Sequence, residues 1–257
     1  MNEENLIKYY NKFNEDKRLT RRHGIIEYRT AMHYLEKYLS TLDNPKIIDI
    51  GAGTGSYSIP LSEKYDVTAV ELVKHNLMTL KRKTTKVKSY LGNALDLSTF
   101  KDNTFDIVIL FGPMYHLIKE EDKIKALSEA KRIVKEKGLI FISYYMNEYA
   151  IIKHGFIENT IKEAIKTNKI DKSFKITPTE TDLYSMVRLE DINHYKSALK
   201  LKRIKILSQD GATDYLRKEI NKMDTETFEL YYKYHLSICE REDLLGASSH
   251  VLDILQK

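Results

Sequence analysis

Glycines and a strand end coincide near the front of the sequence. Residues 47–55 read IIDIGAGTG, so Gly51, Gly53 and Gly55 account for three of only ten glycines among 257 residues. A glycine-rich turn between a buried strand and a helix lets backbone N–H groups approach a ligand closely. Ser56 stands where the third glycine of the dinucleotide pattern G-x-G-x-x-G belongs. The stretch therefore predicts a ligand-binding loop and speaks against a nicotinamide or flavin cofactor.

A carboxylate follows at the tip of the next apolar segment. Glu71 is the fourth residue of TAVEL, about twenty residues beyond the start of the glycine loop. An acid at this position can accept hydrogen bonds from both hydroxyls of a ribose. A glutamate at a strand end is also commonly a plain surface residue. The position alone leaves both interpretations open.

Two further chemical groups lie in the stretch GPMYHL. His116 could act as a general base, because the pKa of histidine lies close to the working pH of most enzymes. Alternatively, its ring could simply hold the loop by hydrogen bonds. Tyr115 precedes it, and Pro113 is expected to stiffen the turn.

The elements that must position these groups alternate along the chain. Strand-like apolar runs are expected at 46–52, 66–72, 87–93, 105–112 and 139–145, with helices between them, including 74–83 and 120–137. Gly138 is expected to end the last of these helices. Continuous β-branched runs alternating with helices indicate a parallel sheet covered on both faces. The predicted fold is therefore doubly wound α/β.

Four parts are expected along the chain. Residues 1–44 form an N-terminal helical cap, 45–146 a ligand-binding core, 147–200 a polar helical insertion, and 201–257 the completion of the sheet. Because the insertion falls between two strands of one sheet, we interpret it as a lid, with residues 1–30 as the other part of the roof.

Composition restricts the class of protein. The hydrophobic fraction of 42% and the charged fraction of 31% are ordinary for a globular protein. The single cysteine, Cys239, cannot form an internal disulfide and is expected to be buried. Neither a membrane-spanning run nor a signal peptide is recognised, so the expected location is cytoplasmic. The lysines behind the net charge of +5 are dispersed, which favours a solvated surface over nucleic-acid binding. No metal is expected.

Five segments in order resemble one family. IIDIGAGTGSYSI, TAVEL, GNALDL, FDIVILFGPMYHL and EAKRIVKEKGLIFIS, spread over residues 46–145, resemble the class I S-adenosylmethionine-dependent methyltransferases. The resemblance implies a seven-stranded, mostly parallel sheet whose last strand is antiparallel, with LKRIKIL and HVLDILQK as the final two strands. It also implies S-adenosylmethionine as cofactor and S-adenosylhomocysteine as product.

The resemblance also assigns the cofactor site. The methionine part of the cofactor is expected to lie among loop and strand-end residues, namely Asp49, Gly51, Ala52, Gly53, Gly55, Phe111 and Gly112. Glu71, followed by Leu72, is expected to bind the ribose. At the adenine end the commoner Gly-Asp-Ala is replaced by Gly92-Asn93-Ala94. Asn93 and Ala94 are our first choice there, because an amide oxygen can still accept a hydrogen bond, and Asp96 is the second.

Methyl transfer is an in-line displacement in which positioning contributes much of the rate. Tyr115 and His116 are the candidate catalytic residues, and the candidate substrate residues are Arg22, His23, Tyr28, Tyr149 and Tyr184. The expected reaction methylates an N or O atom of a small molecule. A methyltransferase of RNA or protein and a catalytically silent cofactor-binding protein remain alternatives. The sequence leaves the methyl acceptor and the oligomeric state open.

Overall fold

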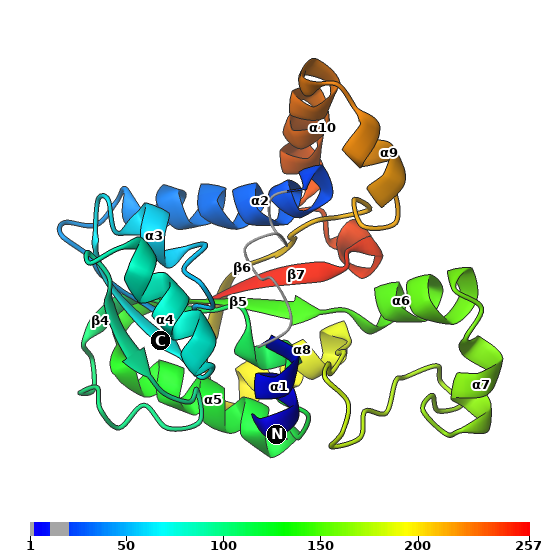
Figure 1. Ribbon diagram of the computed structural model, residues 1–257, viewed down its shortest axis with the longest axis horizontal. Helices are drawn as coiled ribbons and strands as arrows, with labels where there is room; N and C mark the ends of the chain where they lie inside the picture. Colours follow the sequence, from blue (N-terminus) through cyan, green and yellow to red (C-terminus); the bar gives the residue numbers. More distant parts are fainter. Residues whose placement is uncertain (1–2, 11–20) are drawn as a thin grey trace.

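A single seven-stranded sheet organises the protein. The computed structural model describes residues 3–10 and 21–257, and its sheet has the order β3-β2-β1-β4-β5-β7-β6 (Figure 1). The strands are β1 (Lys46–Ile50), β2 (Asp66–Glu71), β3 (Lys88–Leu91), β4 (Phe105–Leu110), β5 (Val134–Tyr145), β6 (Lys202–Ser208) and β7 (His250–Gln256). β1 to β5 pair in parallel, whereas β7 runs antiparallel to both β5 and β6. The predicted mostly parallel sheet with an antiparallel last strand is confirmed.

Helices cover both faces of this sheet (Figure 1). α2 (Arg22–Leu39), α3 (Ser58–Leu61) and α4 (Lys74–Lys83) lie on one face, and α5 (Glu120–Ile133) and α8 (Leu189–Ala198) lie on the other. Successive strand side chains point to opposite faces. Ile47 of β1 therefore packs beneath α2, while Ile48 packs on the side of α5. Burial on both faces explains why the strands are continuous apolar runs.

The helix expected at 120–137 is shorter, and this part of the prediction is wrong. α5 ends at Ile133, and Val134 already has extended backbone and begins β5. Gly138 therefore lies inside a strand and caps no helix. A Cβ at Gly138 would come within 2.9 Å of the carbonyl oxygen of Asp106, so the close approach of β4 requires glycine there. The β-branched Val134 fits helical spacing but pairs with Phe105.

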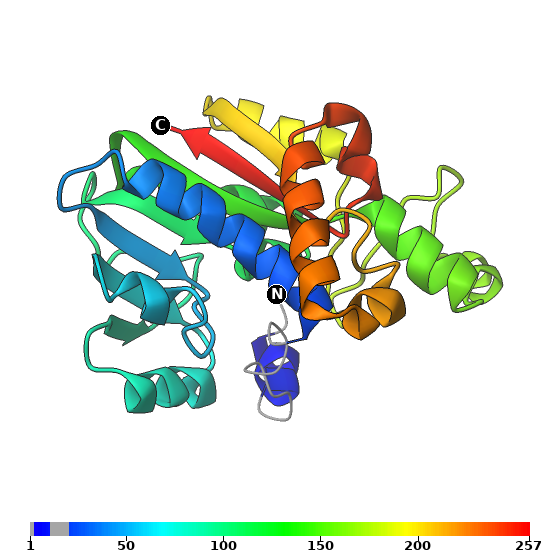
Figure 2. The ribbon, with the colours of Figure 1, turned by 90° about the horizontal axis from the view of Figure 1, so that it is seen from above.

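Helices from both ends of the chain pack together beside the sheet. α9 (Arg217–Lys222) and α10 (Thr225–Ile238) lie against the N-terminal half of α2 (Figure 2). Ile26, Ile220 and Phe228 form the shared apolar cluster, and Arg29 donates to both carboxylate oxygens of Glu229 at 2.6 and 2.9 Å. Cys239, which follows α10, is buried as expected.

The chain between β5 and β6 leaves the sheet and returns through α8. α6 (Asn147–Ala150), the π-helix η3 (Ile151–Ile157) and α7 (Ile161–Lys166) project beyond the end of the sheet (Figure 1). Ile151, Ile161 and Ile170 give them a small core of their own. α8, in contrast, packs on α5 and belongs to the cover of the sheet. Within the described ranges, no helix is long and apolar enough to cross a membrane.

A buried ion pair joins β6 to β7. Arg203 donates to both carboxylate oxygens of Asp253, at 2.7 and 2.8 Å, and the Asp253 side chain is fully buried. Burial raises the pKa of Asp253, and Arg203 opposes this rise. The Arg203 guanidinium therefore stabilises the ionised carboxylate of Asp253 between the two strands.

Arg203→Ala is expected to lower the free energy of unfolding by about 3–5 kcal/mol, because it leaves a buried carboxylate unpaired. Urea denaturation at pH 7 measures this. Lys88→Ala is the matched control, since Lys88 pairs with Asp66 at 2.7 Å on the exposed surface and should cost less than about 1 kcal/mol. Equal losses in the two variants would contradict the assignment.

Candidate active site

A pocket opens at the carboxyl ends of β1, β2 and β4. It encloses about 900 Å³, part of it open to solvent. Its lining comprises Leu6, Tyr10, Asp49, Gly51, Ala52, Gly53, Ser56, Tyr57, Glu71, Leu72, Val73, Asn76, Gly92, Asn93, Ala94, Phe111, Gly112, Pro113, Tyr115, His116 and Leu117. Among these described lining residues are two acids and no lysine or arginine. The pocket therefore suits a ligand that carries positive charge.

The glycines of the loop serve different purposes. Gly51 has φ +77°, and a Cβ there would lie 2.7 Å from Cδ of Pro113. Gly53 has φ +57° and lines the pocket. Gly55 has φ +94°, but its Cβ would meet Ile59 at 2.8 Å, and it is not among the lining residues. Gly51 and Gly53 thus border the ligand space, whereas Gly55 lets the loop pack on the following helix, and its expected cofactor contact stays a prediction.

Glu71 is fixed by the backbone around it. Its Oε2 accepts a hydrogen bond from the Gly53 N–H and its Oε1 accepts one from the Val73 N–H, both at 2.8 Å. The residue is only 5% exposed and lines the pocket. The interpretation as a plain surface glutamate therefore fails, and the carboxylate also ties the glycine loop to β2.

Asp49, on β1, is the second buried acid of the pocket. The Ser58 hydroxyl donates to its Oδ2 at 2.5 Å. Burial raises the pKa of Asp49 to about 7, the Ser58 hydrogen bond opposes this rise, and the nearby charge of Glu71 adds to it. Asp49 is thus poised to lose its proton when a cation enters.

At the expected adenine end, our first-choice residues lie in the lining of the pocket, whereas the second choice lies outside it. Asn93 and Ala94 line the pocket, as do Ala52, Leu72, Phe111 and Gly112. The Asn93 side-chain oxygen accepts from the Leu95 N–H at 2.9 Å. Asp96 is exposed and lies outside the lining, and its carboxylate accepts from the Ser98 N–H at 3.0 Å. Asp96 therefore shapes its own turn in this structure, and its contact with adenine stays a prediction.

His116 connects the pocket to two distant segments. Its Nδ1 lies 2.9 Å from the carbonyl oxygen of Leu183, so Nδ1 carries the proton and donates it. In the neutral ring, Nε2 then accepts from the Tyr10 hydroxyl at 2.8 Å. Tyr10 belongs to α1 (Glu3–Tyr10), which also contributes Leu6 to the lining. The sequence prediction missed Leu6 and Tyr10, although the amphipathic pattern of this short helix could have indicated that one of its faces packs against the protein.

The expected substrate residues are distributed over different places. Tyr184 lies beside the pocket, with its ring 5.1 Å from that of His116 and 6.1 Å from that of Tyr115. Tyr28 contacts the lining residue Tyr57, with 5.3 Å between ring centroids.

None of the five substrate candidates is a lining residue, and the other three contact different parts of the protein. Arg22 donates to Thr225 and His23 to Asn221, so both belong to the contact of α2 with α9 and α10. Both residues lie at the start of α2, where they contact α9 and α10. Their charge therefore gives no information about the ligand. Tyr149 is buried and donates to Asp214 at 3.2 Å.

Comparisons with known proteins agree with this geometry. Residues 48–142 match the family model described as a methyltransferase domain. An uncharacterized protein of Methanocaldococcus jannaschii is 29% identical over 175 residues, covering 66% of this chain and 70% of the relative. An uncharacterized methyltransferase of Schizosaccharomyces pombe is 29% identical over 126 residues, covering 43% of each.

Solved structures share the fold. A methyltransferase from Thermotoga maritima, described as a possible histamine N-methyltransferase, superposes with a TM-score of 0.59 at 17% identity and covers 97% of each chain.

Residues 48–142 match a methyltransferase domain, and the strand order and the glycine loop agree with the resemblance to the class I S-adenosylmethionine-dependent methyltransferases. The protein is a methyltransferase, and its cofactor is S-adenosylmethionine. The pocket fits this ligand, because the sulfonium and ammonium groups of S-adenosylmethionine are cationic and Asp49 and Glu71 are buried in the lining.

Glu71→Ala is expected to weaken S-adenosylmethionine binding by about 2–3 kcal/mol, or roughly 30- to 150-fold in Kd, because charge-assisted hydrogen bonds are lost. Gly53→Val should do as much by filling the space beside the ligand. Calorimetric titration measures both. Glu63→Ala, an exposed glutamate paired with Lys86, is the control and should bind like the parent. Parent-like binding by Glu71→Ala would show that the cofactor lies elsewhere.

Binding of S-adenosylmethionine is expected to strengthen as the pH rises from 5.5 to 7. The free protein holds a proton on Asp49 below pH 7, because the pKa of this acid is raised to about 7. A cation favours the ionised form, so binding releases that proton and becomes roughly tenfold weaker at pH 5.5. Calorimetry in buffers of different ionisation enthalpy counts the proton. Asp49→Asn should abolish the dependence, and an unchanged slope in that variant would assign it to another group.

Proposed function

We propose that this methyltransferase transfers the methyl group to an N or O atom of a small molecule. The main support is the enclosure of the pocket, in which α1 and the segment 183–185 meet over His116. Tyr10 bonds to one nitrogen of that ring and the Leu183 carbonyl to the other. The Ser185 N–H also donates to the Tyr115 carbonyl at 2.7 Å. A roof of this kind fits a small methyl acceptor better than a polymer.

The proposed place for the methyl acceptor is the acceptor side, which we define as the space around the rings of Tyr115, Tyr145 and Tyr184. The ring of Tyr184 lies 6.1 Å from the ring of Tyr115 and 6.1 Å from that of Tyr145. Phenol rings offer apolar walls with polar tips, which suits a partly aromatic or amphipathic molecule. Tyr115 lines the pocket, so a molecule among these rings would approach the cofactor directly.

His116 has a different proposed part from the general base considered from sequence. Both of its ring nitrogens are engaged within the protein, by Leu183 and by Tyr10. We assign it the task of holding α1 and the segment 183–185 over the bound cofactor. We therefore propose that only the part of residues 147–200 near Tyr184, and not the whole insertion, acts as a lid.

A methyl-transfer screen tests the proposal. Release of S-adenosylhomocysteine is measured with a panel of small amines, alcohols, phenols and carboxylic acids, and in parallel with total RNA and a peptide library. At least one small molecule is expected to be methylated, while RNA should bind weakly and lose affinity steeply with added salt. Methylation of RNA or peptides alone would favour the polymer alternatives. Tight S-adenosylmethionine binding with no release in any arm would favour a silent cofactor-binding protein.

A further inference from the structure

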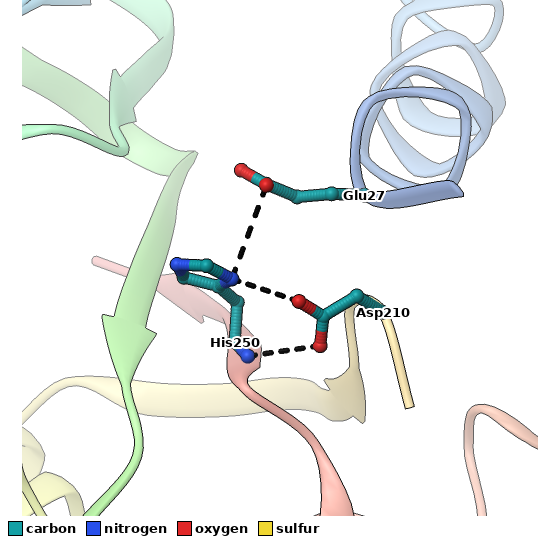
Figure 3. Close-up of side chains that lie close together, drawn as sticks. All are labelled: Glu27, Asp210 and His250. Carbon is teal, nitrogen blue, oxygen red and sulfur yellow. Dashed lines mark hydrogen bonds and ion pairs between the residues drawn. The ribbon is translucent and has the colours of Figure 1, made fainter. Parts of the chain in front are cut away.

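A second group of ionisable side chains lies at the same edge of the sheet as the pocket. Asp210 follows β6, His250 begins β7, and Glu27 comes from α2 (Figure 3). One ligand-type atom from each of them lies within 4.8 Å of the others. Their side chains are 4%, 14% and 10% exposed, in the same order. Three ionisable groups so nearly buried together require a chemical reason.

Hydrogen bonds determine which nitrogen of His250 carries a proton. The Asp210 Oδ2 lies 2.8 Å from Nδ1, and Asp210 Oδ1 accepts from the His250 backbone N–H at 2.9 Å. The hydroxyls of Ser248 and Ser249 donate to the same carboxylate at 2.7 and 2.8 Å. Burial alone would raise the pKa of Asp210, but the charge of His250, its two hydrogen bonds and the Ser248 hydroxyl hold it below its usual value. An ionised carboxylate only accepts, so Nδ1 is the donor.

The second nitrogen of the ring faces the other way. Figure 3 shows Nε2 on the edge of the imidazole remote from both carboxylates, on the side of β5. There the ring stacks on Tyr145, with 5.3 Å between centroids and 26° between planes. The ring of Tyr115, which lines the cofactor pocket, is 6.1 Å away. His250 therefore borders the acceptor side.

The same three side chains could alternatively bind a divalent cation. The proton on Nδ1 stands against it, because it points at Asp210 and occupies the direction a metal bond would need. The Asp210 carboxylate is already surrounded by four donors. The geometry instead matches a base oriented by a buried acid.

We propose that His250 is the proton acceptor of the methyl transfer, with Asp210 and Glu27 as positioning residues. The proposal rests on the proposed function above. As the N or O atom of the substrate attacks the methyl carbon, the carbon–sulfur bond breaks and its electron pair stays on sulfur. The proton of the attacking atom passes to Nε2 of His250. Asp210, at 2.8 Å from Nδ1, and Glu27, at 3.9 Å, then stabilise the imidazolium.

The first test needs no methyl acceptor. In ¹⁵N-labelled protein saturated with S-adenosylhomocysteine, nitrogen chemical shifts at pH 8 should show His250 protonated on Nδ1 and unprotonated on Nε2. Diethyl pyrocarbonate, which carbethoxylates neutral imidazole, should modify His250 in the same complex, as peptide mass spectrometry would show. Exposed His75 and buried His235 are the reactive and unreactive controls. A proton on Nε2, or protection equal to that of His235, would overturn the proposal.

The second test uses a methyl acceptor found in the screen. His250→Gln should lower kcat by about 10²–10⁴-fold with KM little changed, and the decline of kcat toward low pH should disappear. Asp210, Glu27, Tyr145 and Tyr115 face this ring, and Asp214 lies behind Ser249. Glu27→Gln should therefore shift that pH limb without abolishing turnover, which separates it from a structural defect. His194→Gln, on the exposed surface of α8, is the control and should turn over like the parent.

Failure of this proposal is distinguishable from failure of the proposed function. If the screen finds no small methyl acceptor, the nitrogen shifts and the modification still decide the state and accessibility of His250. If a small molecule is methylated and His250→Gln retains kcat and the pH profile, only the base assignment is wrong. Loss of turnover with a chelator, restored by Mn²⁺ or Zn²⁺, would identify a metal site instead and would also overturn it.

Discussion

Two buried carboxylates that face one cavity are the constraint on which the cofactor site depends. The parallel pairing of β1 with β2 brings Asp49 and Glu71 to the same edge of the sheet, where like charges repel and water is scarce. Hydrogen-bond donors stabilise both carboxylates: the Ser58 hydroxyl donates to Asp49, and two backbone N–H groups donate to Glu71. One of those N–H groups belongs to Gly53, so the shape of the loop and the charge of the site stabilise each other.

The two sides of the site are assembled from the chain in different ways. Nearly all the lining of the cofactor pocket comes from one continuous stretch, residues 49–117. The proposed acceptor side instead brings together Tyr115, Tyr145 from the end of β5 and Tyr184 from the insertion, with His250 at its border. Under this proposal, substitutions there would change what is methylated while the bonds of the glycine loop remain intact.

The sequence predicted most of the loop and strand-end residues that line the pocket, because their signals are local. Gly51 and Glu71 occupy positions set by a strand end and a tight turn, which periodicity and spacing express directly. The error at Gly138 has the opposite origin. Ile133 and Val134 fit a helix, and only pairing with β4 ends it. Tyr10 with His116, and Asp210 with His250, are 106 and 40 residues apart, and such contacts depend on tertiary packing that no local pattern encodes.

The position of β7 also governs the order in which the protein can be assembled. Every strand pair of β6 is made with β7, and β7 lies between β6 and β5. Residues 46–145 can complete five parallel strands as soon as they are available, but β6 has no partner until residues 250–256 insert. On a ribosome, which delivers the chain from its N-terminus, the cofactor side can therefore form first. Asp210 and His250 come together only when β7 is in place, so the proposed proton acceptor would form later than the cofactor side.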